Sequence, residues 1–346
     1  MNFSRARIAA IGYEIPPHVV SSADLEERLA PLYEALRIPR GQLEAITGIR
    51  ERRYWSPGFR PSEGASRAGR KALEAAGVDP REVGMLIYAA VCREHLEPAT
   101  ACAVADRLGI GPDCQVLDVS NACLGVLNGM LLAAGAIELG HIRAGLVVAC
   151  ESAREIVDLT IARLNREPSM ETLRKTLATL TGGSGAAAVL LTERSFLPGG
   201  RRLRGAVCRS APRHHRLCTW GPDTGIPDGR AHMAETDAAE VLRHGVALGV
   251  ETFEAFRREL ALPEGAPDRI VCHQVGATHQ RTFLEAVGIP AERDFTTFRF
   301  LGNTGTVSLP LTAALAEERG VLRPGELVGW LGIGSGLNCL MLAIDW

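Results

Sequence analysis

Aromatic residues, excess charge and long apolar runs are all scarce in this 346-residue sequence. Phe, Trp and Tyr make up 5% of the residues, while Gly and Ala are abundant, so we expect backbone packed closely on backbone rather than an aromatic-rich binding surface. The formal net charge of −2 gives no indication of a nucleic-acid-binding or membrane-surface protein. The longest uncharged stretch runs from Val119 to Ile137. Its length would allow a membrane span, but its polar residues favour a strand end leading into a buried helix, and no transmembrane segment is expected.

Cysteine pairs are also missing. The nine cysteines form no C-x-x-C motif and have no metal-ligand spacing, and most lie in apolar stretches. This pattern indicates reduced thiols in a cytoplasmic protein and argues against a disulfide framework or a metal site. The apolar patch after Arg7 is interrupted at Glu14 and is too short for a signal peptide.

The pattern of apolar segments predicts strands alternating with helices, which is typical of an α/β fold with a largely buried sheet. Strand-like runs lie at Met85–Val91, Gln115–Ser120, Gly145–Ala149, Ala186–Leu191, Ile270–Cys272, Leu327–Leu331 and Asn338–Ile344. Helices are predicted at Ala99–Leu108, Cys123–Leu139 and Gly305–Glu318, the second apolar on all sides and therefore buried.

Two glycine-rich segments resemble each other, GGSGAAAVLL at 182–191 and GIGSGLNCLM at 332–341. Duplication of a βα unit explains the similarity, although glycine turns are common in all sheets. We therefore expect two halves, residues 1–195 and 196–346. The helical segment 155–180, broken near Pro168, is an insertion in the first half. Residues 195–229 are rich in Arg, Gly, Pro and His, and are predicted to form a long connector.

Cys123 is the strongest candidate for chemistry. The segment 118–125 reads DVSNACLG and places a thiol where a strand ends and a helix begins. The positive end of a helix dipole stabilises a thiolate, and the small neighbours leave room for an acyl group. A purely structural cysteine is the alternative.

Three further positions are weaker candidates when each is taken alone. His273 follows a core strand in IVCHQV, where histidine serves acid–base chemistry or simply packs. Asn303 lies in the turn LGNTG, where asparagine usually serves the backbone. The segment 332–336, GIGSG, is predicted to be a turn whose backbone N–H groups face a developing oxyanion, or only a bend between strands.

Together these segments resemble the β-ketoacyl synthase III branch of the thiolase superfamily. The Cys123, His273 and Asn303 segments, the SLP at 308–310 and the glycine-rich C-terminal strand occur in the family's order, over nearly the whole chain. The resemblance implies a five-layered α-β-α-β-α fold of two duplicated halves, a homodimer and a Cys-His-Asn triad. It also implies that the backbone N–H groups of Cys123 and Ser335 stabilise the oxyanion.

Within this branch, four segments look like the OleA family of bacterial olefin and β-lactone biosynthesis. They are ERLAPLYE at 27–34, CREHLEPATA at 92–101, SNACLG at 120–125 and LGIGSGLNC at 331–339. The resemblance implies that two fatty acyl-CoA molecules are condensed without decarboxylation to a 2-alkyl-3-oxoacyl product, released as the acid. This condensation requires no cofactor. The resemblance also implies that a hydrolase, ligase or reductase of the same pathway acts on the product.

A condensation without decarboxylation needs a base for the α-proton. The resemblance assigns this role to Glu97, on a loop that crosses the dimer interface to the partner's site, and assigns to His273 and Asn303 the donors that stabilise the enolate. Without the family, Glu97 would be interpreted as a solvated carboxylate near a helix N-terminus. The Asn-Thr step of LGNTG is closer to the decarboxylating synthases.

Three alternatives remain open at this point. The first is a decarboxylating synthase III that uses a malonyl thioester, which CO₂ release would reveal. The second is a non-catalytic subunit, which the joint presence of Cys123, His273, Asn303 and Glu97 opposes. The third is a synthase of the hydroxymethylglutaryl type, which fits the Glu97 loop and the C-terminal segment less well.

Overall fold

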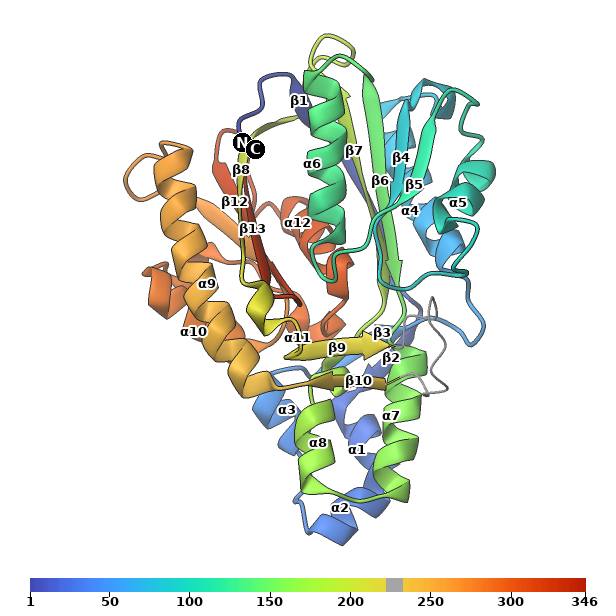
Figure 1. Cartoon of the computed structure of the whole chain (residues 1–346), viewed down its shortest axis with the longest axis vertical. Coiled ribbons are helices and arrows are strands. Elements are labelled where there is room, and N and C mark those ends of the chain that lie inside the picture. The colour runs from blue at the N-terminus through green and yellow to red at the C-terminus, as the bar shows by residue number, and fades with distance from the viewer. Residues whose placement is uncertain (222–232) are drawn as a thin grey trace.

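The computed structural model describes residues 1–221 and 233–346, and its centre is a nine-stranded mixed sheet (Figure 1). In spatial order the strands are β11 (Arg269–Cys272), β12 (Leu327–Gly334), β13 (Asn338–Asp345), β8 (Arg201–Ser210), β1 (Ala6–Glu14), β7 (Gly185–Glu193), β6 (Ala144–Glu151), β4 (Met85–Tyr88) and β5 (Gln115–Asp118).

The same pairing pattern occurs twice, on either side of the contact between β1 and β8. From β1 outward, the β1–β7 and β7–β6 pairs are antiparallel, and the β6–β4 and β4–β5 pairs are parallel. From β8 outward, the β8–β13 and β13–β12 pairs are antiparallel, and the β12–β11 pair is parallel. A parallel bridge between Ile270 and Asp294 stands where the fifth strand of this set would lie.

Helices cover the outer faces of the two sets of strands, and two further helices form a layer between them. The five-layered prediction requires this arrangement. α4 (Pro61–Ala76) packs on β1, β7 and β6, and α5 (Thr100–Leu108) packs on β4 and β5. α6 (Gly125–Glu138) and α12 (Ser308–Glu318) form the inner layer, and α9 (Ala238–Glu259) and α10 (Ala277–Val287) cover the β8–β13 side. The chain therefore has the predicted α-β-α-β-α arrangement.

Small residues make this close layering possible. A Cβ on Gly12 of β1 would collide with the carbonyl oxygen of Ala68 in α4, and one on Gly125 of α6 would collide with that of Ala89. Strands β6 and β7 are buried along their whole length, which suits sheets covered on both faces. The abundant Gly and Ala residues thus allow backbone to pack closely on backbone, as predicted.

A smaller unit lies beyond one end of the sheet, at the bottom of Figure 1. It contains β2 (His18–Ser21), β3 (Glu51–Tyr54), α1 (Ser22–Arg28), α2 (Ala30–Leu36), α3 (Gln42–Thr47), α7 (Arg154–Arg166) and α8 (Met170–Thr176). The hairpin of β9 (Cys218–Gly221) and β10 (Met233–Thr236) lies between this unit and the sheet, and α11 (Phe298–Leu301) precedes the Asn303 turn. The helical character predicted for residues 155–180 is confirmed, since the segment contains α7 and α8 with a break at Pro168.

Three sequence predictions were wrong. The predicted connector 195–229 contains the central strand β8 and the edge strand β9, and its residues 222–229 lie outside the described residues. The helix expected from Cys123 begins at Gly125, because Ala122 has φ +46° and the segment from Asn121 to Cys123 forms a tight bend. Strand β12 continues to Gly334, so the turn after it is confined to residues 335–337.

Helix α6 is apolar on all sides as predicted, but one of its faces is uncovered. Leu132 is 49% exposed and Leu139, which follows the helix, is 72% exposed. Among the helices of the described residues, none is long and apolar enough to cross a membrane.

Candidate active site

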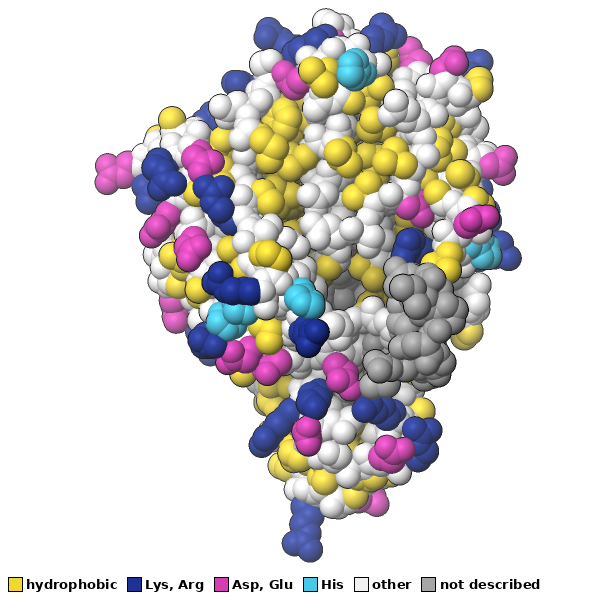
Figure 2. Space-filling view, in the orientation of Figure 1, with side chains coloured by type: hydrophobic (Ala, Val, Ile, Leu, Met, Phe, Trp, Pro, Cys, Tyr) yellow, Lys and Arg dark blue, Asp and Glu magenta, His cyan; other side chains and the backbone are white. Residues whose placement is uncertain are grey.

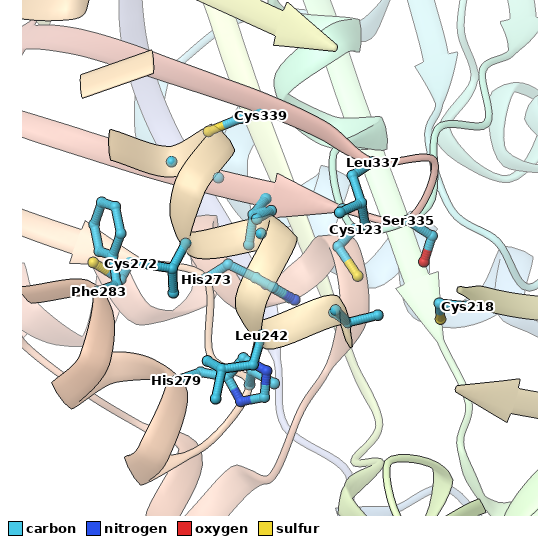
Figure 3. A pocket seen from close by; sticks show the side chains of 18 of the residues that line it. Cys123, Cys218, Leu242, Cys272, His273, His279, Phe283, Ser335, Leu337 and Cys339 are labelled. Atoms are coloured by element: carbon cyan, nitrogen blue, oxygen red, sulfur yellow. The ribbon is translucent and has the colours of Figure 1, made fainter. Parts of the chain in front are cut away.

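Cys123 lies in the bend between β5 and α6, with its side chain in a cavity (Figure 3). The left-handed backbone of Ala122 is uncommon for a residue with a Cβ, and such conformations gather at functional sites. The first turn of α6 is fixed by the Thr306 hydroxyl, which accepts the Val126 N–H at 2.7 Å. This bond ties the Cys123 segment to the loop that carries Asn303.

The thiol of Cys123 is not stabilised as a thiolate in the resting protein. Burial, with smaller contributions from the neighbouring Cys218 and Glu151, raises the pKa of Cys123 to about 12. The sequence prediction of a dipole-stabilised thiolate is wrong at this point, because Cys123 lies two residues before the first residue of α6 and desolvation outweighs the dipole. A reaction at this sulfur therefore needs a group that takes its proton.

His273 directly follows β11 and is held by both backbone and side chain. Its N–H donates to the carbonyl oxygen of Leu331 at 3.0 Å, and its Nδ1 lies 2.7 Å from Ser308 Oγ. Burial, with a smaller contribution from His279, lowers the pKa of His273 to about 4. The imidazole is therefore neutral at physiological pH, as an acid–base group in an apolar cavity must be to accept a proton.

Asn303 stands in a turn that is clamped on both sides. Its N–H donates to Thr181 O at 2.9 Å, and its carbonyl oxygen accepts the Gly183 N–H at 2.8 Å. A Cβ on Gly183 would collide with Leu301 O, so the first glycine-rich segment is needed for this approach. The side-chain Oδ1 accepts the Gly305 N–H at 3.0 Å, which leaves the NH₂ group as the donor that Asn303 can offer in the cavity.

The turn after β12 packs against the Cys123 segment. A Cβ on Gly334 would lie 3.5 Å from the backbone nitrogen of Cys123, and Ser335 lines the same cavity. The Asn338 amide donates to Asn121 Oδ1 and to Ser335 O, both at 3.2 Å. Sequence reasoning missed this asparagine bridge, because neither residue carries a recognisable motif.

Glu97 does not reach this cavity within its own chain. It is exposed, on the loop between β4 and α5, and it is not among the residues that line the cavity. The start of the loop is anchored by buried Glu151, whose carboxylate accepts the N–H groups of Val91 and Cys92 at 3.0 and 3.2 Å. The structure thus brings together Cys123, His273, Asn303 and Ser335, but not Glu97.

The cavity extends away from Cys123 between α9, α10 and strands β12 and β13. Its empty volume, open mouth included, is about 1050 Å³. The walls of the cavity are largely apolar and include Val241, Leu242, Val246, Phe283, Leu331, Ile333, Leu337 and Met341. Sequence reasoning found none of these wall residues, nor Cys218 and His279, and the 155–180 insertion contributes only Ala178. No group of His, Cys, Asp and Glu within the described ranges could hold a metal ion.

Comparison with known proteins agrees with this fold. Residues 117–210 match 3-oxoacyl-[acyl-carrier-protein] synthase III, and residues 259–346 match the C-terminal part of the same family. Together with the layered sheet and the cysteine in the cavity, this identifies a condensing enzyme of the thiolase fold.

Full-length relatives define the family more closely. An acyl-CoA:acyl-CoA alkyltransferase of Shewanella oneidensis is 51% identical over 350 residues, and one of Xanthomonas campestris is 36% identical over 347 residues, each covering 100% of both chains. A β-ketoacyl-[acyl-carrier-protein] synthase III of Rhizorhabdus wittichii is 29% identical over 344 residues, 99% of both chains. The chain belongs to the acyl-CoA:acyl-CoA alkyltransferase family.

Solved structures of Xanthomonas campestris OleA have the same fold. One with bound lauric acid and lauroyl-CoA has a TM-score of 0.93 at 35% identity and covers 99% of this chain and 100% of that chain. One with bound cerulenin has a TM-score of 0.94 at 36% identity, covering 100% of this chain and 98% of that one. Other structures of that enzyme carry a replaced cysteine, glutamate or histidine.

Proposed function

We propose that this protein condenses two fatty acyl-CoA molecules, without decarboxylation, to a 2-alkyl-3-oxoacyl product that is released as the 2-alkyl-3-oxo acid. The observation that carries the proposal is a thiol that lines a largely apolar cavity together with a neutral imidazole and an amide donor. The family supports the same reaction, and the bound lauroyl-CoA of the Xanthomonas enzyme indicates the substrate class. The reaction uses coenzyme A thioesters as substrates and no cofactor.

The first half-reaction acylates the enzyme. Cys123 attacks the thioester carbonyl of one acyl-CoA, and the backbone N–H groups of Cys123 and Ser335 donate to the oxyanion. The packing of Gly334 against the Cys123 nitrogen supports this pairing of donors. Coenzyme A leaves, and the alkyl chain of the acyl group occupies the apolar cavity along α9.

The second half-reaction forms the carbon–carbon bond. The second acyl-CoA places its carbonyl oxygen beside the Asn303 NH₂ group, which stabilises the enolate when the α-proton is removed. The enolate carbon attacks the acyl-cysteine and expels the Cys123 sulfur, which gives a 2-alkyl-3-oxoacyl-CoA. Water then cleaves this thioester, and the 2-alkyl-3-oxo acid and the second coenzyme A are released. His273 is neutral, so the step that it serves depends on which ring nitrogen carries the proton.

Glu97 of the partner subunit takes the α-proton in this scheme. Glu97 is exposed and does not line its own cavity, so it cannot serve there as a desolvated base, whereas a loop that enters a partner's site can. In the Xanthomonas enzyme, the glutamate and the cysteine that are substituted in solved structures are separated by the same number of residues as Glu97 and Cys123. This matching separation supports the assignment.

A homodimer would cover the surface that a single chain leaves open. Strand β5 is at the edge of the sheet, and edge strands offer unpaired backbone groups to another chain. Hydrophobic side chains gather over α6 (Figure 2), where Leu132 and Leu139 are exposed, and Leu96 beside Glu97 is 55% exposed. A dimer that buries this face also brings the Glu97 loop to a neighbouring chain.

Two further assignments belong to this proposal. The chain divides into halves 1–195 and 196–346, and the repeated strand order on either side of the β1–β8 contact supports this boundary. The protein is cytoplasmic, which its nine unpaired cysteines support. Its product would pass to a hydrolase, ligase or reductase of the same pathway.

Product analysis tests the proposal. Incubation with a single saturated acyl-CoA should yield a 2-alkyl-3-oxo acid that contains both acyl chains, with no malonyl thioester present. The decarboxylating alternative predicts no product under these conditions, and product with CO₂ release once malonyl thioester is added. The Cys123→Ala variant is the control for non-enzymatic condensation.

A further inference from the structure

Ser308 is a buried hydroxyl that contacts the catalytic cavity only through His273. It is the first residue of α12 and is 1% exposed. Its Oγ lies 2.7 Å from His273 Nδ1 and 2.9 Å from the carbonyl oxygen of Gly305. A carbonyl oxygen only accepts hydrogen bonds, and a hydroxyl has one proton to donate.

Gly305 O also accepts the Ser308 backbone N–H, and the two contacts of Ser308 Oγ are both hydrogen bonds in only one arrangement of the protons. The Ser308 O–H donates to Gly305 O, so Ser308 Oγ is left as the acceptor for a proton on His273 Nδ1. Since the ring is neutral, a proton on Nδ1 means that Nε2 carries a lone pair. In Figure 3 the His273 side chain points toward Cys123.

We propose that Ser308 is a positioning residue that holds His273 in the Nδ1–H form, so that Nε2 takes the Cys123 proton as the thiol attacks the first acyl-CoA. The inference rests on the proposed function. As the Sγ–acyl bond forms and the acyl–CoA sulfur bond breaks, the proton passes from Sγ to Nε2 and then to the departing CoA sulfur. His273 is neutral again at the end of the step.

The composition of the cavity supports this role. Among the described residues that line it, the bases that could accept a thiol proton are the imidazoles of His273 and His279, and no carboxylate is among them. Of the two, His273 is the one whose side chain points toward Cys123 in Figure 3. A thiol whose pKa is raised, as that of Cys123 is, has most need of such an acceptor.

The inference changes the role that family resemblance assigned to His273. With its lone pair on Nε2, His273 cannot donate to the enolate oxygen. Asn303 is then the donor in the second half-reaction, and His273 serves the first. Loss of Ser308 and loss of Asn303 should therefore affect different half-reactions.

The tautomer can be observed directly in the resting dimer. Long-range ¹H–¹⁵N spectra of protein labelled with ¹⁵N-histidine distinguish protonated from unprotonated ring nitrogens, and His273→Gln assigns the signals. We expect a protonated Nδ1 and an unprotonated Nε2 in the wild type, and loss of that preference in Ser308→Ala. A protonated Nε2 in the wild type would overturn the proposal, whatever the enzyme condenses.

Acyl-enzyme measurements provide the functional test. Ser308→Ala should slow acylation of Cys123 by about 100-fold or more, the usual contribution of a general base. During turnover its acylated fraction, measured by intact mass, should fall below that of the wild type, whereas in Asn303→Ala this fraction should rise. Acylation at the wild-type rate in Ser308→Ala would contradict the proposal.

Thr312→Val is the matched control. Thr312 is also a fully buried hydroxyl on α12, but it bonds Thr297 at 2.7 Å and not His273. Removing either hydroxyl should lower the melting temperature similarly, because each loses one buried hydrogen bond. If Thr312→Val slows acylation as much as Ser308→Ala does, the effect is structural and the proposal fails. Acylation of Cys123 is measured directly, whether or not a condensation product forms. A failure of the proposed condensation is therefore distinguished from a failure of the role proposed for Ser308.

Discussion

The length of acyl chain that the cavity accepts should depend on Gly249 in α9. A Cβ at this position would lie 2.9 Å from Phe283 Cε2 and 3.2 Å from Cδ2, closer than side chains normally approach. Both residues line the cavity, and in Figure 3 Phe283 lies at the side away from Cys123. Gly249→Ala, and more strongly Gly249→Val, should therefore displace the Phe283 ring into the space that the alkyl chain occupies.

The size of the effect follows from the hydrophobic free energy of the methylenes that no longer fit. Each buried methylene contributes about 0.8 kcal/mol, or roughly a fourfold change in kcat/KM. Alanine should exclude about one methylene, and valine about two, so long chains should lose roughly 4-fold and roughly 16-fold relative to short ones. Both substitutions replace glycine inside a helix with a better helix former, so the fold should persist.

The assay is the rate of Cys123 acylation across a series of saturated acyl-CoA lengths. Glu251→Val, at an exposed position of the same helix, controls for the effect of valine on α9. Rates should be unchanged for short chains and fall progressively for long ones. An equal loss at every length, or an unchanged length profile, would show that the alkyl chain does not lie along α9.

Other expectations concern the nucleophile, the enolate donor and one buried carboxyl. Cys123→Ala should remain folded but lose acyl transfer by at least about a thousandfold. Intact mass should show no acyl adduct in this variant, and an adduct on another cysteine would refute the assignment. Asn303→Ala should lose about 3 kcal/mol of transition-state stabilisation in condensation, measured by single-turnover product formation, and unimpaired condensation would exclude its role. Burial raises the pKa of Asp294 from 3.8 to about 7. Between these values the folded state holds a proton that the unfolded state has released, so this carboxyl makes stability fall as the pH rises from about 4 to 7. The melting temperature of Asp294→Asn relative to wild type should therefore be higher at pH 8 than at pH 5, and a difference independent of pH would contradict this.

The sequence allowed the α/β alternation and the meeting of Cys123, His273 and Asn303 to be predicted. Cys123 and His273 follow β5 and β11, parallel-paired strands that the sequence pattern predicted, and the turn of Asn303 precedes the buried helix α12. The order of the three segments, which matches that of the family, then predicted that they form one site. Their geometry supports chemistry at one cavity.

Strand β8 could not be predicted because its charges are paired through tertiary contacts. Its arginines made the segment look like a connector, yet Arg201, Arg204 and Arg209 pair with Glu317, Asp345 and Glu259, while Leu203 and Val207 face the core. Those carboxylates lie far away in the sequence. A local pattern cannot anticipate such pairs.

The pKa of Cys123 and the hydrogen bond between His273 and Ser308 could not be predicted either, because both depend on how the folded chain packs. The sequence placed a thiol near a helix start, but only the folded cavity determines that desolvation outweighs the dipole. Likewise, Ser308 follows Asn303 in the chain but contacts His273 across the inner layer.

Mixed dimers test most directly whether the base comes from the partner subunit. Glu97→Gln alone should acylate Cys123 but not condense, and Cys123→Ala alone should do neither. In a dimer of one of each, one site combines an intact Cys123 with its partner's intact Glu97. A 1:1 mixture that exchanges subunits freely should regain about a quarter of wild-type activity, since half of the dimers contain one complete site of two. If native mass spectrometry shows mixed dimers and the mixture still produces no 2-alkyl-3-oxo acid, the α-proton is not taken by Glu97 of the partner.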